Sequence, residues 1–303
     1  MINLRHIKFL GIIIFSLLLS SQTFADKKFE KDLKKISKDN GFIDNFGNIY
    51  SDDKITDKSK TILIIYTHGG MGDQTLDKCL KKWNLVAPVI RNLHNKIINN
   101  YQIKIYRLCT GVRGWSKAEQ DKMWKSTSKK RLTLKNSEGE LLFHKVKDFL
   151  RIKIIKAKID QFKSDGFENI VLAGHSMGGW ASLKFKTIHP DLIEGSIGLH
   201  PGSGGTKKNR KDWPWWEEVR NYGFGNLSNL NALIVTHDKD NFNSPNDYSM
   251  FKNLTKVKFV NITSSECKKK ATLGGYHGLA LTKCFANEDL RSKEITKYLE
   301  GIF

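Results

Sequence analysis

The sequence predicts an α/β fold in which helices cover both faces of a doubly wound, mainly parallel sheet. Two observations support this fold class. Short runs that are apolar and rich in β-branched residues recur along the chain, and such runs are typical of strands buried on both faces. Stretches with apolar residues at helical spacing separate these runs, and the alternation of strands with helices is typical of a doubly wound sheet.

The elements follow one another without an internal repeat or a low-complexity linker. Strands are expected at 61–66, 101–108, 170–173, 192–199, 232–236 and 257–262, with a hairpin at 42–50. Helices are expected at 83–97, 145–163 and 287–303, and in a segment that opens at Trp180 and ends at His189-Pro190.

Residues 1–25 are expected to be a secretory signal peptide. A basic start precedes an apolar run at 9–19, and the segment ends in a small residue, Ala25, as a cleavage site requires. The alternative is an uncleaved N-terminal anchor. We expect an exported protein, periplasmic or secreted, without a stable membrane anchor, in which residues 26–303 form a single domain.

Two polar segments, 111–144 and 203–230, are candidate caps over a functional site. They contain five of the seven tryptophans: Trp115, Trp124, Trp213, Trp215 and Trp216. These side chains form either a lid that binds an apolar group or anchors that fix long loops to the core.

All four cysteines follow the proposed cleavage site, so an oxidising compartment would allow disulfides. Pairing between neighbours, Cys79 with Cys109 and Cys267 with Cys284, closes the shortest loops. The second bond would enclose His277. Four free buried thiols remain the alternative.

The net charge of +20 does not indicate a nucleic-acid-binding protein. Only nine of the 51 basic residues are arginine, and the lysines are scattered instead of forming a stripe. We therefore expect no nucleic-acid partner. We also expect the protein to be a monomer that acts on a small molecule.

The motif Gly174-His175-Ser176-Met177-Gly178-Gly179 lies between an expected strand and an expected helix. A serine between glycines at such a sharp turn has the pattern of a nucleophile elbow, because small flanking residues allow the strained backbone and the close helix.

Three further loops follow expected strands. Thr67-His68-Gly69-Gly70-Met71-Gly72 follows the strand at 61–66, and its glycines allow backbone N–H groups to converge on one point. His237-Asp238-Lys239-Asp240 follows the strand at 232–236, and His277 lies between glycines after the last strand. The order serine, acid, histidine is the one that this architecture uses.

Over residues 61–303 the chain resembles the α/β-hydrolase superfamily, specifically exported serine hydrolases of the esterase and lipase kind. The resemblance implies that Ser176 is the nucleophile and His277 the general base and acid. It also implies an oxyanion hole formed by the backbone N–H groups of Met177 and of Gly70 or Met71. No cofactor is implied, and no metal-ligand spacing is present.

The triad acid is open between two residues. Asp240 fits the family's spacing better than Asp238, because Asn241 to Pro245 follow it, and Asp247 is a distant third. The implied function is cleavage of a carboxylic ester or related acyl bond through an acyl-enzyme. The alternative is a non-catalytic envelope protein that keeps the fold to bind a ligand or partner.

Overall fold

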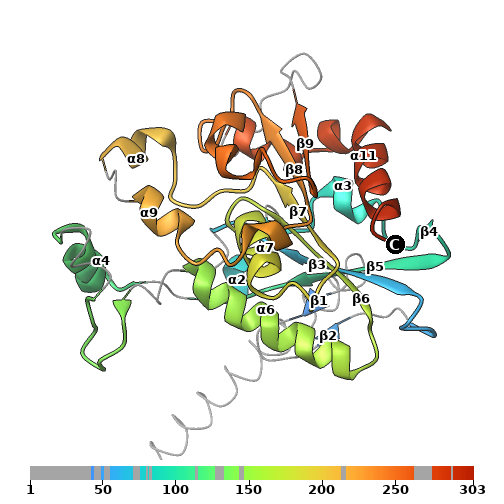
Figure 1. Cartoon of the computed structure of the whole chain (residues 1–303), viewed down its shortest axis with the longest axis horizontal. Helices are drawn as coiled ribbons and strands as arrows, with labels where there is room; N and C mark the ends of the chain where they lie inside the picture. The colour runs from blue at the N-terminus through green and yellow to red at the C-terminus, as the bar shows by residue number, and fades with distance from the viewer. Residues whose placement is uncertain are drawn as a thin grey trace, which may run out of the picture.

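A computed structural model gives the structure of the chain (Figure 1). It describes residues 42–43, 49–50, 55–70, 76–79, 81, 84–112, 115–126, 133–142, 147–212, 216–262, 275–287 and 289–303. The expected signal peptide lies outside the described residues, and so does Cys267 of the expected bond to Cys284.

The centre of the molecule is a sheet with the strand order β2-β1-β5-β3-β6-β7-β8-β9, in which β4 pairs with β5 (Figure 1). All pairs are parallel except β1 with β2 and β4 with β5. The chain starts the main sheet at β3, adds β5 on one side and then adds β6 to β9 on the other. This order confirms the doubly wound fold class. The strands are β1 (Phe42–Ile43), β2 (Ile49–Tyr50), β3 (Thr61–Thr67), β4 (Ile97–Ile98), β5 (Tyr101–Leu108), β6 (Asn169–His175), β7 (Gly195–Leu199), β8 (Ala232–His237) and β9 (Val257–Ile262).

Helices cover both faces of the sheet because alternate strand residues point to opposite sides. Ile62 and Ile64 of β3 belong to one buried cluster with residues of α3 (Pro88–Arg91), α10 (Lys283–Asn287) and α11 (Asp289–Glu300). Leu63 and Ile65 of the same strand belong to a second cluster with α6 (Lys147–Ser164) and α7 (Met177–Ile188).

The remaining helices are short. In Figure 1, α4 lies at the periphery, apart from the sheet, and α8 and α9 lie on the same side of the picture. They are α2 (Leu76–Cys79), α4 (Lys117–Trp124), α8 (Lys207–Asp212) and α9 (Trp216–Asn221), with 3-10 helices η4 (Leu227–Asn229), η5 (Pro245–Phe251) and η6 (Tyr276–Leu281).

The six long strand predictions and the hairpin at 42–50 are confirmed, but the predicted helix at 83–97 is wrong. Of the described residues 84–97, only the four of α3 are α-helical. Asn95, Asn99 and Asn100 have positive φ angles, which end helices and favour turns. Ile97 consequently belongs to β4, and its side chain is exposed.

A disulfide joins Cys79 of α2 to Cys109, which follows β5, and confirms the first predicted pairing. None of the described helices is long and apolar enough to cross a membrane.

A buried ion pair connects α6 with α7. The Lys184 ammonium donates to Asp148 at 2.6 Å and to the carbonyl of Tyr222 at 2.7 Å, and both charged side chains are almost fully buried. Because Tyr222 follows α9, the same contact fixes the segment after α9 against α7.

Candidate active site

Ser176 lies at the tight turn between β6 and α7. Its backbone angles are φ 54° and ψ −124°, a strained conformation for a residue with a side chain. The turn is this tight because its neighbours have no side chains. A Cβ added at Gly174 would lie 2.5 Å from the carbonyl carbon of Gly178, and one at Gly178 would lie 2.2 Å from the carbonyl oxygen of Thr67.

The structure brings Ser176, His277 and Asp240 into one hydrogen-bonded chain. The Ser176 hydroxyl lies 2.8 Å from Nε2 of His277, and Nδ1 of His277 lies 2.9 Å from Oδ2 of Asp240. Nδ1–H donates to the carboxylate, so the lone pair of Nε2 is left to accept the serine proton. The order of contacts is that of a nucleophile, a base and an acid that orients the base.

Asp240, and not Asp238, contacts His277. Burial acts to raise the pKa of Asp240, but the hydrogen bond and charge of His277, aided by His200 and the N–H of Phe242, hold that pKa below its usual value. Asp240 is therefore an anion at neutral pH. The Asp238 side chain is 47% exposed and lies against His237.

Asp247, the third candidate acid, has a structural position. Its carboxylate accepts hydrogen bonds from the backbone N–H and the hydroxyl of Ser244 at the start of η5. It also lies 3.4 Å from both Lys207 and Arg210.

The ring of Phe242 covers His277. The two ring centroids are 4.1 Å apart and the planes are nearly parallel. Phe242 and Asp240 belong to the same loop after β8, so this loop supplies both the carboxylate that contacts His277 and an apolar cover. The cover strengthens the hydrogen bond between Asp240 and His277 by keeping water from it.

Two backbone segments converge beside Ser176. Met177 begins α7, whose first N–H groups have no partner within the helix and carry the positive end of its dipole. Gly70 lies against Met177, since a Cβ there would be 3.3 Å from Cε of Met177. Met71 lies outside the described residues. Gly70 and Met177 can therefore direct N–H groups toward an oxyanion at Ser176.

Arg151 of α6 holds the segment that carries Gly70. Its guanidinium donates to the carbonyl of His68 and, at 2.9 Å, to that of Gly69, and its side chain is fully buried. Burial and the Arg151 charge keep the pKa of His68 well below its usual value, so His68 is neutral. Arg151 thus fixes the carbonyls of this loop.

A cavity of about 380 Å³ opens beside Ser176. One wall comes from the Gly69–Gly70 segment and Met177, and another from Gly202 to Gly205 of the loop after β7. Leu281 and Phe242 add apolar surface. Among the described residues, the segment 203–230 therefore contributes to the cavity lining, and the segment 111–144 does not.

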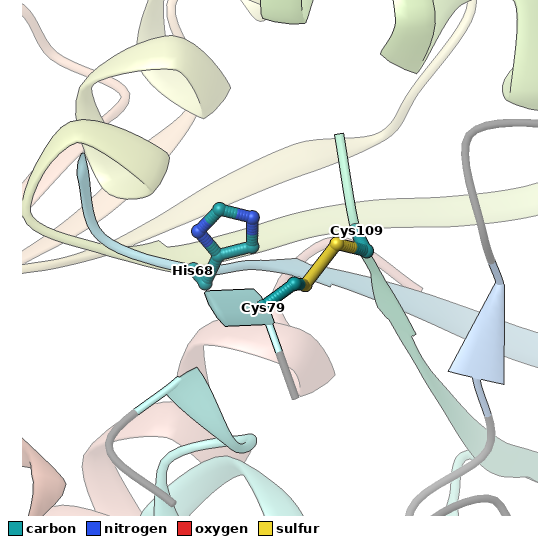
Figure 2. Close-up of side chains that lie close together, drawn as sticks. All are labelled: His68, Cys79 and Cys109. Atoms are coloured by element: carbon teal, nitrogen blue, oxygen red, sulfur yellow. A yellow bond between two sulfur atoms is a disulfide. The ribbon is translucent and has the colours of Figure 1, made fainter. Parts of the chain in front are cut away.

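Two groups of described His and Cys side chains lie close enough together to suggest a metal site, because their possible ligand atoms are within 4.8 Å of one another. Figure 2 shows the first, His68 beside Cys79 and Cys109. Its two sulfurs are bonded to each other, whereas a metal requires thiolates.

The second group is His175, His200 and His277. Both ring nitrogens of His277 are occupied by Asp240 and Ser176, and His175 and His200 each use one nitrogen on a carbonyl oxygen. We assign neither group to a metal.

Three residues that contact the site were not predicted from the sequence: Arg151, His175 and His200. Arg151 lies far from every motif, and nothing in its sequence context indicates a contact with His68. His175 and His200 have a visible signal, because each lies where a buried strand meets a glycine-containing loop, but no role could be read from that position.

No protein-family model and no curated protein sequence matches the chain. Among solved structures, Est1E from Butyrivibrio proteoclasticus is 16% identical over 80% of this chain and 89% of its own, with a TM-score of 0.44. A thermostable esterase is 17% identical over 81% of this chain and 56% of its own (TM-score 0.43). A soluble variant of monoglyceride lipase from Saccharomyces cerevisiae is 12% identical over 82% and 88% (TM-score 0.43).

Sequence identity this low does not show that the chain shares the activity of these proteins. The fold is assigned from this chain's own strand order and from the strained turn at Ser176. By both criteria, the chain has the α/β-hydrolase fold.

Proposed function

We propose that the chain is a serine hydrolase that cleaves a carboxylic ester or a related acyl bond through an acyl-enzyme. The observation that carries the proposal is the continuous hydrogen-bond chain from Ser176 through His277 to Asp240, beside a cavity. A protein that only bound a ligand would not need a serine aligned on a base that is itself aligned on a buried carboxylate.

In the first step, Oγ of Ser176 attacks the carbonyl carbon while Nε2 of His277 takes its proton. The oxyanion that forms lies toward the N-terminus of α7, where the N–H groups of Met177 and Gly70 stabilise it. The imidazolium is stabilised by the Asp240 carboxylate and then protonates the leaving alcohol. Water, deprotonated by the same nitrogen, attacks the acyl-enzyme and releases the acid.

The test is hydrolysis of p-nitrophenyl acetate and longer p-nitrophenyl esters, with matched variants of the two aspartates. Asp240→Asn should lower kcat by about 10⁴-fold, because it removes the charge and orients the imidazole wrongly. Asp238→Asn should leave kcat unchanged, because Asp238 does not contact His277. Equal losses in both variants, or no turnover by the folded wild-type chain, would contradict the proposal and favour a ligand-binding protein.

We also infer that the chain acts outside the cytoplasm after removal of residues 1–25. The bond between Cys79 and Cys109 supports this inference, because oxidising compartments preserve disulfides. N-terminal sequencing of the protein recovered from its native cells should begin at Asp26. A sequence that begins at Met1 or Ile2 would contradict processing.

A further inference from the structure

The geometry points to His175 and His200 as positioning residues that hold the backbone of His277 through its carbonyl oxygen. This role goes beyond the orientation of the His277 ring by Asp240. It rests on the proposed function, because it concerns how His277 is placed as a base.

Two imidazole N–H groups converge on one acceptor. Nε2 of His175 lies 2.8 Å from the carbonyl oxygen of His277, and Nδ1 of His200 lies 3.0 Å from the same atom. A carbonyl oxygen only accepts, so each of these nitrogens must carry the hydrogen. His175 therefore carries a hydrogen on Nε2, and His200 carries one on Nδ1.

Both donors are fixed to the sheet. His175 ends β6, and its register partner is Leu199, the residue before His200. The N–H of His200 donates to the carbonyl of Val235 in β8 at 2.8 Å. His200 has φ 44°, a strained value for a histidine, and strain of this kind persists where surrounding contacts impose it. The two donors therefore form a rigid support.

His277 itself is not carried by a strand. It is the second residue of η6, which begins after Gly275 with a positive φ of 61°. A short 3-10 helix has weaker hydrogen-bond geometry than an α-helix or a sheet, so it fixes a side chain less firmly. The bonds from His175 and His200 attach this helix to the ends of β6 and β7, and Ser176 and Met177 follow β6 directly.

The charge state of the two donors suits this role. Burial lowers the pKa of His175 to about 3 and that of His200 to about 4. Both are therefore neutral at neutral pH, so they add no positive charge beside His277 when it takes the serine proton.

The test uses amide side chains that match one imidazole nitrogen each. The amide nitrogen of Gln reaches about as far as Nε2 of His, and that of Asn about as far as Nδ1. His175→Gln and His200→Asn should therefore retain most of kcat. His175→Met and His200→Gln, which fill space but offer no donor at the right point, should lower kcat roughly tenfold. KM should change little in the His200 pair, since His200 does not line the cavity.

Turnover is expressed per active serine, titrated with a fluorophosphonate, so that variants that fold poorly are not scored as slow. A purely structural role predicts variants with fewer active serines but wild-type kcat per site, and that result would overturn the inference. Equal kcat in His175→Gln and His175→Met would overturn it too. If the wild-type chain neither reacts with the fluorophosphonate nor turns over an ester, the proposed function fails first, and the two failures are thus distinguishable.

Discussion

A methyl group added at Gly178 should separate Ser176, the proposed nucleophile, from Gly70, a proposed oxyanion donor. A Cβ at this position would lie 2.2 Å from the carbonyl oxygen of Thr67 and 2.5 Å from that of His68. Both atoms belong to the backbone that leads to Gly70, so neither can rotate away. The N-terminus of α7, with Ser176, must then move by about 1 Å relative to the end of β3, a displacement that costs roughly 100-fold in rate.

The assay is kcat/KM for p-nitrophenyl acetate, measured together with urea unfolding. Gly178→Ala should lower kcat/KM roughly 100-fold and the free energy of unfolding by about 1–3 kcal/mol, because it overpacks a filled region. The control is Gly301→Ala, whose Cβ would meet its nearest atoms, the carbonyl oxygens of Lys297 and Tyr298, at 3.4 and 3.5 Å. It should match wild type in activity. Wild-type kcat/KM in Gly178→Ala would refute the reasoning.

Three further predictions concern stability. Replacing both Cys79 and Cys109 by Ser should lower the free energy of unfolding by about 3–4 kcal/mol, as expected for a loop of 30 residues; an unchanged urea midpoint would count against the bond. Lys184→Met should cost about 3–5 kcal/mol because it leaves the Asp148 charge buried without its partner, and Asp148→Leu in addition should restore much of this; a larger loss in the double variant would contradict the ion-pair account. His200 has a folded pKa of about 4, below its unfolded value of 6.5, so its contribution to stability falls as the pH drops from 6.5 to 4. Over that range His200→Asn should reduce the pH slope of the unfolding free energy by about 1.4 kcal/mol per pH unit, and parallel curves for variant and wild type would show that His200 titrates normally.

The sequence predicts the sheet well because buried parallel strands have an unambiguous composition. Six apolar runs correspond to six strands, and the expected elbow has the strained angles that only its glycine neighbours allow. The prediction of a helix at 83–97 is wrong because it used only the spacing of apolar residues and ignored residues that favour turns. Pro88 begins a single turn, Asn95 with its positive φ precedes β4, and Asn99 and Asn100, also with positive φ, connect β4 to β5.

The sequence likewise locates some residues of the candidate site and not others. Ser176 and His277 could be located because each lies in a glycine-containing loop after a strand. The choice between Asp240 and Asp238 depends on which of the two carboxylates the loop turns inward toward His277. Sequence spacing favours Asp240 but does not decide between them. Arg151 could not be found from sequence, because its contacts join a helix face to a loop more than 80 residues away.

Covalent labelling tests most directly whether Ser176 is an activated nucleophile. The folded, oxidised chain would be treated with a fluorophosphonate and the modified peptide identified by mass spectrometry, with Ser176→Ala as the control. We expect one adduct per chain, located on Ser176 and lost in the variant. An unlabelled wild-type chain, or equal labelling of the variant at another residue, would contradict it.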